Sequence, residues 1–162
     1  MADVNAKLMS SPLPYANADI PANWENRNIL QVKIEVYSSG LRQACFVFNG
    51  QKSTVISWMS RDRLICSSYQ APDHEKLDLL DVAGEAPFRF SVHETRGGCE
   101  GTCGFLSAVE PGSDCPSLAG GPVRPYFLYS TRGSSCARWH RGDEYGIGDL
   151  FVVSVLMCDL NS

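Results

Sequence analysis

Alternating hydrophobic and polar residues are the feature that most limits what this chain can fold into. Over residues 30–36 every second residue is apolar, beginning with Leu30 and ending with Val36. A period of two places these side chains on one face, which predicts a β-strand with one buried face. Residues 88–93 repeat the pattern, with His93 on the polar side. The sequence shows almost no helical periodicity.

Further short segments favour strands: 45–48, 53–58, 64–66, 104–109, 126–131 and 147–158. Asn49-Gly50 predicts a type I′ turn that joins the first two of them into a hairpin. The last segment is almost continuously apolar, which predicts a central strand covered on both faces. Residues 73–82 fit either a helical turn or a strand edge.

The predicted fold class is therefore all-β. About eight short strands separated by Gly/Pro turns indicate an antiparallel β-sandwich or jelly roll, with an open barrel as the nearest alternative. A length of 162 residues suits one domain. Pro12, Pro14 and Pro21 predict an extended N-terminal arm over residues 1–28, followed by a single domain over 29–162.

Charge and hydropathy exclude two classes of partner. The 14 basic and 18 acidic side chains give a net charge of −4, and no basic cluster is available to bind the phosphates of a nucleic acid. No apolar run reaches the roughly 20 residues that a membrane-spanning helix needs. We therefore expect neither nucleic-acid binding nor membrane insertion.

The seven cysteines divide by context. Cys45, Cys66 and Cys158 fall on predicted strands, where buried free thiols are common, and the odd total predicts one buried strand thiol. The other four lie in irregular segments and are disulfide candidates: Cys99, Cys103, Cys115 and Cys136. Their pairing is open. Disulfides favour an extracellular location, whereas the absence of a signal-peptide pattern at the start leaves a cytoplasmic location as the alternative.

Zinc binding is the competing interpretation of these cysteines. Cys99 and Cys103 are separated by three residues, as are Cys136 and His140. This spacing suits two pairs of ligands around one tetrahedral zinc ion. Disulfides explain the same residues with fewer geometric demands, so we expect disulfides, no metal and no cofactor.

The densest group of charged and amphipathic side chains lies between two predicted strands, and we expect it to bind a ligand. It comprises Arg138, Trp139, His140, Arg141, Asp143, Glu144 and Tyr145. Sugar binding needs an aromatic face for stacking and planar polar groups for the hydroxyls, and this group has both. The alternative is that Trp139 is a core residue whose indole N–H is bonded locally.

Arg141-Gly142-Asp143 resembles the integrin attachment tripeptide. Displayed at a loop tip, its guanidinium and carboxylate would suit a receptor groove in which the carboxylate completes the coordination of a divalent ion. A tripeptide match is easily accidental, and Gly142 also fits a plain turn.

Catalytic signatures are absent from the sequence. The histidines are His74, His93 and His140, and none is placed beside a recognisable nucleophile motif. We therefore expect a non-catalytic extracellular recognition module, lectin-like or active in adhesion or immune recognition, whose partner is a glycan or a cell-surface protein. The alternatives are an assembly protein that forms homo-oligomers through its arm or a free thiol, and a leaderless zinc-binding domain.

Overall fold

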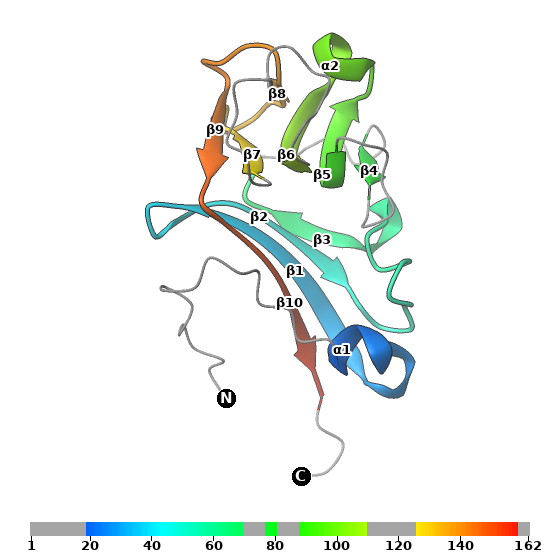
Figure 1. The fold of residues 1–162 in the computed structure, drawn as a ribbon. Helices are drawn as coiled ribbons and strands as arrows, with labels where there is room; N and C mark the ends of the chain where they lie inside the picture. The colour runs from blue at the N-terminus through cyan, green and yellow to red at the C-terminus, as the bar shows by residue number, and fades with distance from the viewer. Residues whose placement is uncertain (1–18, 70–76, 81–87, 110–125, 159–162) are drawn as a thin grey trace.

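The computed structural model describes residues 19–69, 77–80, 88–109 and 126–158. Within these ranges the chain forms two antiparallel sheets, which confirms the all-β sandwich class (Figure 1). The four-stranded sheet has the order β10-β1-β2-β3, and the six-stranded sheet has the order β4-β5-β6-β7-β9, with β8 paired to β6. The predicted segment 110–125 and Cys115 lie outside the described residues.

The strands of the four-stranded sheet are β1 (Ile29–Ser38), β2 (Leu41–Asn49), β3 (Leu64–Ser67) and β10 (Leu150–Met157). The predicted strand at 30–36 is the middle of β1, where Val32, Ile34 and Val36 are fully buried. β1 pairs with β10 on one side and β2 on the other, so its inward residues lie at the centre of the sheet.

The six-stranded sheet is built from β4 (Asp78–Leu80), β5 (Phe88–Thr95), β6 (Cys103–Val109), β7 (Tyr126–Ser130), β8 (Ala137–Arg138) and β9 (Tyr145–Gly148). The ambiguous segment 73–82 thus contains a short strand in its described part. A four-residue helix, α2 (Gly98–Gly101), joins β5 to β6. α2 and β8 lie together at one end of the molecule, which we call the loop end (Figure 1).

Aromatic side chains fill the space between the sheets. Phe46 of β2 lies 6.4 Å from Phe105 of β6, and Phe127 of β7 lies 5.1 Å from Phe151 of β10, both measured between ring centroids. Tyr69 donates a hydrogen bond across the core, with its hydroxyl 2.9 Å from the carbonyl oxygen of Phe105. The core therefore ties together elements from both sheets.

The predicted hairpin after Asn49 is wrong. The tight hairpin turn lies one strand earlier, at Ser39 and Gly40, whose φ angles are 52° and 76°. A type I′ turn needs positive φ at both central residues, and glycine adopts it without steric cost. Residues 53–58 form turns, and Trp58 is buried, as expected, but it is not on a strand.

The predicted central strand at 147–158 is also wrong. Asp149 divides the run into β9 and β10, and its N–H donates to the carbonyl oxygen of Tyr37 at 2.9 Å. β9 belongs to one sheet and β10 to the other, each as the outermost strand of the described order. The apolar run therefore spans two edges, where each strand has one neighbour.

The N-terminal region differs from an extended arm in its described part. Residues Asp19–Ala22 form helix α1, and Trp24–Asn26 form a 3₁₀ turn, η1. Trp24 is buried in the core, and its indole nitrogen donates to the carbonyl oxygen of Ser53 at 2.9 Å. Trp24 thus attaches this segment to the core, and residues 1–18 lie outside the described ranges.

The described residues contain no helix with the length and hydrophobicity of a membrane-spanning segment.

Candidate functional site

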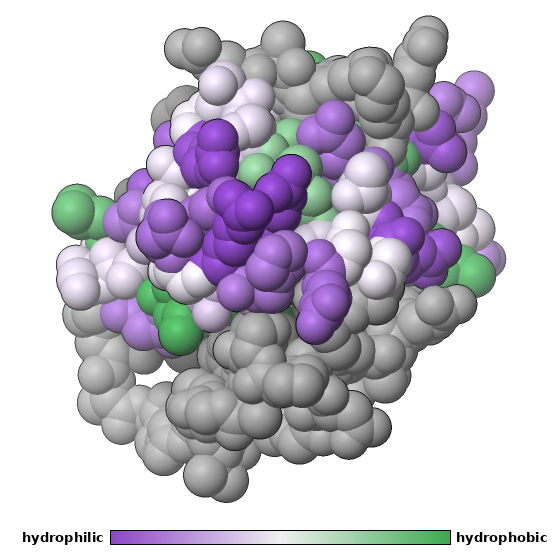
Figure 2. Space-filling view, turned by 90° about the horizontal axis from the view of Figure 1, so that it is seen from above, coloured by the Kyte–Doolittle hydropathy of each residue, from purple (hydrophilic) through white to green (hydrophobic). Residues whose placement is uncertain are grey.

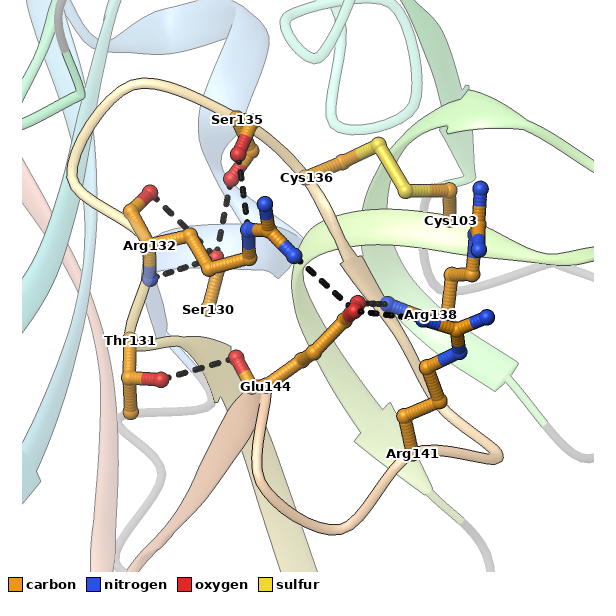
Figure 3. Close-up of polar contacts among 9 residues, drawn as sticks. All are labelled: Cys103, Ser130, Thr131, Arg132, Ser135, Cys136, Arg138, Arg141 and Glu144. Atoms are coloured by element: carbon orange, nitrogen blue, oxygen red, sulfur yellow. Dashed lines mark hydrogen bonds and ion pairs between the residues drawn. A yellow bond between two sulfur atoms is a disulfide. The ribbon is translucent and has the colours of Figure 1, made fainter.

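A disulfide cross-links two segments at the loop end. Cys103, at the start of β6, is bonded to Cys136, just before β8, with 5.3 Å between their Cα atoms (Figure 3). The two cysteines are 33 residues apart in the chain. Both were predicted disulfide candidates, and their pairing, which the sequence left open, is now assigned.

An open hollow of about 480 Å³ lies over this disulfide. Its charged lining comes from Glu94 of β5, Glu100 of α2, Arg138 of β8 and His140 in the following turn. Figure 2 views the molecule from the loop end and shows hydrophilic side chains gathered on this face. The hollow therefore offers carboxylate acceptors and guanidinium and imidazole groups around one space.

Glu144 organises the turn beside the hollow. Its Oε1 lies 2.9 Å from Nη1 of Arg132 and 3.5 Å from Nη1 of Arg141 (Figure 3). Its Oε2 accepts the backbone N–H of Arg138 at 2.9 Å. That backbone hydrogen bond, followed by the nearby arginines, holds the pKa of the Glu144 carboxyl below its usual range.

The backbone of Glu144 closes the same loop. Its carbonyl oxygen accepts the N–H and the hydroxyl of Thr131 at 3.0 and 2.9 Å. Glu144 thus positions Arg132 and Arg138 at once and keeps its own side chain buried. It is a positioning residue, not an exposed ligand contact as the sequence suggested.

Trp139 does not form the sugar-stacking surface that the sequence predicted. It is fully buried, and its indole nitrogen donates to Nε2 of His93 at 3.4 Å. Its ring packs edge-on against His93 and against the half-buried Tyr145, with centroids 6.3 and 5.9 Å away. Trp139 therefore supports the site from beneath, in agreement with the alternative that it is a core residue.

His93 is also buried, contrary to its expected place on the solvated side of its strand. The register between β5 and β6 shifts on either side of His93, and Ser91, Val92 and His93 all have no exposed surface. Such irregularities break simple alternation. Burial, with a smaller effect from Arg96, lowers the pKa of His93 to about 3.

Gly104 makes room for this pair of rings. A Cβ atom at this position would lie 2.4 Å from the His93 ring and 2.5 Å from the Trp139 ring. Gly104 pairs with both His93 and Ala137, so β5, β6 and β8 meet at this point. A side chain here would displace the rings that support Arg138 and His140.

The disulfide overturns the predicted zinc alternative. Cys103 and Cys136 are bonded to each other, so neither sulfur is a thiolate that could join Cys99 and His140 around zinc. No group of three or more His, Cys, Asp or Glu side chains in the described ranges is placed to hold a metal ion. Cys99 lies in α2, and its side chain is outside what the structure describes.

The strand cysteines are free, but only Cys45 is buried. Burial, together with the nearby Glu35, raises the pKa of its thiol. Cys66 and Cys158 are exposed, so Cys45 is the one buried free thiol of the described residues, as the odd total predicted, and Cys158 departs from its predicted place on a strand because it lies just beyond β10.

Arg141, Gly142 and Asp143 are all exposed in the turn between β8 and β9. Arg141 and His140 are therefore accessible members of the predicted ligand group, together with Arg138. Asp143 is exposed on the same turn, whereas Trp139 and Glu144 are buried.

Sequence reasoning missed Glu94, Glu100 and Arg132 as site residues. Glu94 and Glu100 come from β5 and α2, and the pairing of β5 with β6 and of β6 with β8 brings them beside Arg138. Only the disulfide candidates Cys103 and Cys136 hinted at this approach, because a bond between them joins the two loops.

No family model matches this chain, and comparisons with curated proteins and with solved structures find no match to it.

Proposed function

We propose that the protein is a non-catalytic recognition module that binds a carbohydrate in the hollow at its loop end. The observation that carries this proposal is the mixed lining of the hollow, with Glu94 and Glu100 alongside Arg138 and His140. A sugar hydroxyl both donates and accepts hydrogen bonds, so it is suited to a site that holds both kinds of partner.

The size and support of the hollow fit this role. A volume of about 480 Å³ lies within the usual range for small-ligand sites. The disulfide beneath it and the Glu144 network beside it hold its walls before a ligand arrives. Preorganisation of this kind lowers the entropic cost of binding.

Because Trp139 is buried, the proposed contacts are polar and do not include stacking on an indole face. We therefore expect modest affinity for a single sugar unit and selectivity for hydroxyl orientation. The disulfide supports an extracellular setting for such a ligand.

A panel of immobilised glycans, probed with the full chain, tests the proposal. Arg138→Ala and His140→Ala should each weaken binding about tenfold, in line with the loss of a hydrogen bond to a charged group. Lys52→Asn is the matched control, because it removes a cation from the turn after β2 and asparagine tolerates the positive φ at this position.

Equal binding by the wild-type chain, Arg138→Ala and His140→Ala would contradict the proposed site. Failure of the wild-type chain to bind any glycan in the panel would contradict the function.

Receptor attachment through Arg141-Gly142-Asp143 is a second candidate, favoured by the exposure of all three residues. Adhesion of cells to the immobilised protein should then require divalent cations and be lost in Asp143→Glu, because the longer side chain misplaces the carboxylate. Unchanged adhesion of Asp143→Glu, or no adhesion to the wild-type protein, would exclude it.

A further inference from the structure

β10 is an edge strand with an unusual composition. It runs from Leu150 to Met157 at the end of the strand order β10-β1-β2-β3, and in the described part of the chain its one ladder partner in that order is β1. Its sequence, LFVVSVLM, contains no charged residue and no proline. Edge strands are ordinarily protected by lysine, proline or a short length.

The opposite edge of the same sheet has that protection. β3 has four residues, Leu64–Ser67, and directly follows the arginine-containing turn η2 (Arg61–Arg63). β10 is twice as long and leaves three large apolar side chains exposed: Leu150 at 42%, Val153 at 41% and Leu156 at 55%. The two edges of one sheet therefore differ sharply in how readily they accept another strand.

We propose that β10 pairs antiparallel with β10 of a second copy of this chain, which joins two four-stranded sheets into one continuous sheet. Self-complementary spacing identifies the second copy as the occupant. A two-fold axis perpendicular to the sheet keeps the inner faces of the two copies on the same side. A residue of one copy therefore lies opposite a residue of the other copy whose number differs from its own by an even value.

Centring the axis on Val153 pairs all three exposed side chains across the interface, Leu150 and Leu156 on one face of the sheet and Val153 on the other. Leu150 then lies opposite Leu156 of the other copy, and Val153 lies beside its own counterpart. Because β10 carries no charge, the pairing places no like charges opposite each other, although each chain has a net charge of −4.

This interface differs from a dimer formed through a thiol. Cys158 follows the last residue of β10, so antiparallel pairing centred on Val153 places the two copies of Cys158 at opposite ends of the paired strands, and no disulfide forms between them. The association should therefore persist in the presence of reductant.

The register also sets the direction in which the two binding sites point. β10 starts below β9, in the middle of the molecule, and runs away from the loop end (Figure 1), so antiparallel pairing directs the two loop ends to opposite sides. The dimer would then cross-link two ligand-bearing surfaces. This consequence rests on the proposed carbohydrate function, whereas the dimer itself does not.

Sedimentation analysis of the full chain over a concentration series, with reductant, tests the interface. We expect a dimer for the wild type and an increase of about 100-fold in the dissociation constant for Val153→Lys, because two lysines would face each other at the axis. Ile65→Lys is the matched control, since Ile65 is 49% exposed on the opposite edge strand, and it should leave the dimer intact.

Mixing Val153→Lys with Val153→Glu tests the register itself. The two variants should form a one-to-one heterodimer, because opposite charges then meet at the axis. If Val153→Lys does not fold, Leu156→Lys mixed with Leu150→Glu takes its place.

A wild-type chain that stays monomeric at about 100 μM would overturn the proposal, because a dimer with a micromolar dissociation constant forms at this concentration. A dimer that Val153→Lys leaves unchanged would also overturn it, as would a dimer that appears only after residues 1–18 are removed. The last result would assign the edge to the N-terminal segment. Glycan binding by a monomeric wild type would leave the proposed function standing, so the two proposals can fail separately.

Discussion

The loop end and the four-stranded sheet each hold a buried glutamate between two basic side chains, but for different structural purposes. Glu35 of β1 lies 3.0 Å from Lys33 and 3.1 Å from Arg42, on a strand whose backbone is already paired on both sides. Glu144 lies in a turn, where its side chain and carbonyl oxygen bond to Arg138 and Thr131.

The difference teaches where single side chains matter. A ladder of backbone hydrogen bonds fixes the sheet, so its ion pair adds little to the geometry. The loop end depends on a disulfide, one carboxylate and one pair of buried rings. Substitutions at the loop end should therefore change stability and binding. Substitutions at exposed positions of the four-stranded sheet should leave stability nearly unchanged, and substitution of Glu35 should leave binding nearly unchanged.

Removing the Trp139 ring should give the largest difference in stability between a loop-end variant and a sheet variant. Trp139→Ala deletes a fully buried ring against His93 and should lower the free energy of unfolding by about 3–5 kcal/mol. Ile65→Ala, at an exposed position on β3, should change it by less than about 0.5 kcal/mol. Denaturant unfolding measures both values, and similar small losses would contradict the supporting role of Trp139.

Removing the disulfide should lower the free energy of unfolding slightly less than removing the Trp139 ring. Replacing Cys103 and Cys136 by serine removes a cross-link between residues 33 apart and should lower the free energy of unfolding by about 2–4 kcal/mol. Cys66→Ser is the control, because Cys66 is a free, exposed thiol on β3. A double variant as stable as the Cys66→Ser protein in denaturant titrations would show that the cross-link does not hold the loop end.

Acid should weaken the loop end through His93. The folded state keeps His93 neutral down to a pKa of about 3, whereas the unfolded chain takes up a proton below its ordinary value of 6.5. Stability is therefore complete above pH 6.5 and falls between pH 6.5 and 3, by roughly 2–3 kcal/mol on reaching pH 4.5.

His93→Gln should flatten this slope between pH 6.5 and 5, where carboxylates contribute little. Because the pKa of Glu144 is lowered, its own contribution is lost only at lower pH, as the carboxylate becomes protonated. Unfolding measured over this range in both proteins separates the two groups, and an equal slope in His93→Gln would refute the assignment to His93.

Substituting the two buried glutamates, Glu144 and Glu35, should give the smallest of these differences, measured as glycan affinity. Glu144→Gln should weaken glycan binding about tenfold, because Arg132 and Arg138 lose the carboxylate that positions them. Glu35→Gln should leave binding within about twofold of the wild type, as expected of a substitution away from the site. Calorimetric titration with the glycan that binds best compares the two, and an equal loss would remove the distinction between sheet and loop end.

The sequence predicted those parts of the fold in which one face is buried along a regular strand. β1 follows its apolar alternation, with Val32, Ile34 and Val36 fully buried, because it pairs with strands on both sides. Alternation failed at His93, where the register shifts. The single central strand predicted from the continuous apolar run failed at Asp149, where the chain passes from the six-stranded sheet to the four-stranded sheet.

For the site, composition found Arg138 and His140 because their loop is rich in charge, but it could not separate exposed from buried members. The burial of Trp139 depends on the space above Gly104, and the position of Glu94 depends on strand pairing. Neither is encoded locally. The cysteines indicated a cross-link, but their pairing required the approach of β6 and β8.

The most direct test of the central claim is a titration of the isotope-labelled chain with the best-binding glycan, followed residue by residue by NMR. We predict that amide signals shift at Glu94, Glu100, Arg138 and His140, which surround the hollow, while signals from β1 and β2 stay in place. Shifts confined to the four-stranded sheet, or no shifts at the hollow at saturating glycan, would contradict the account.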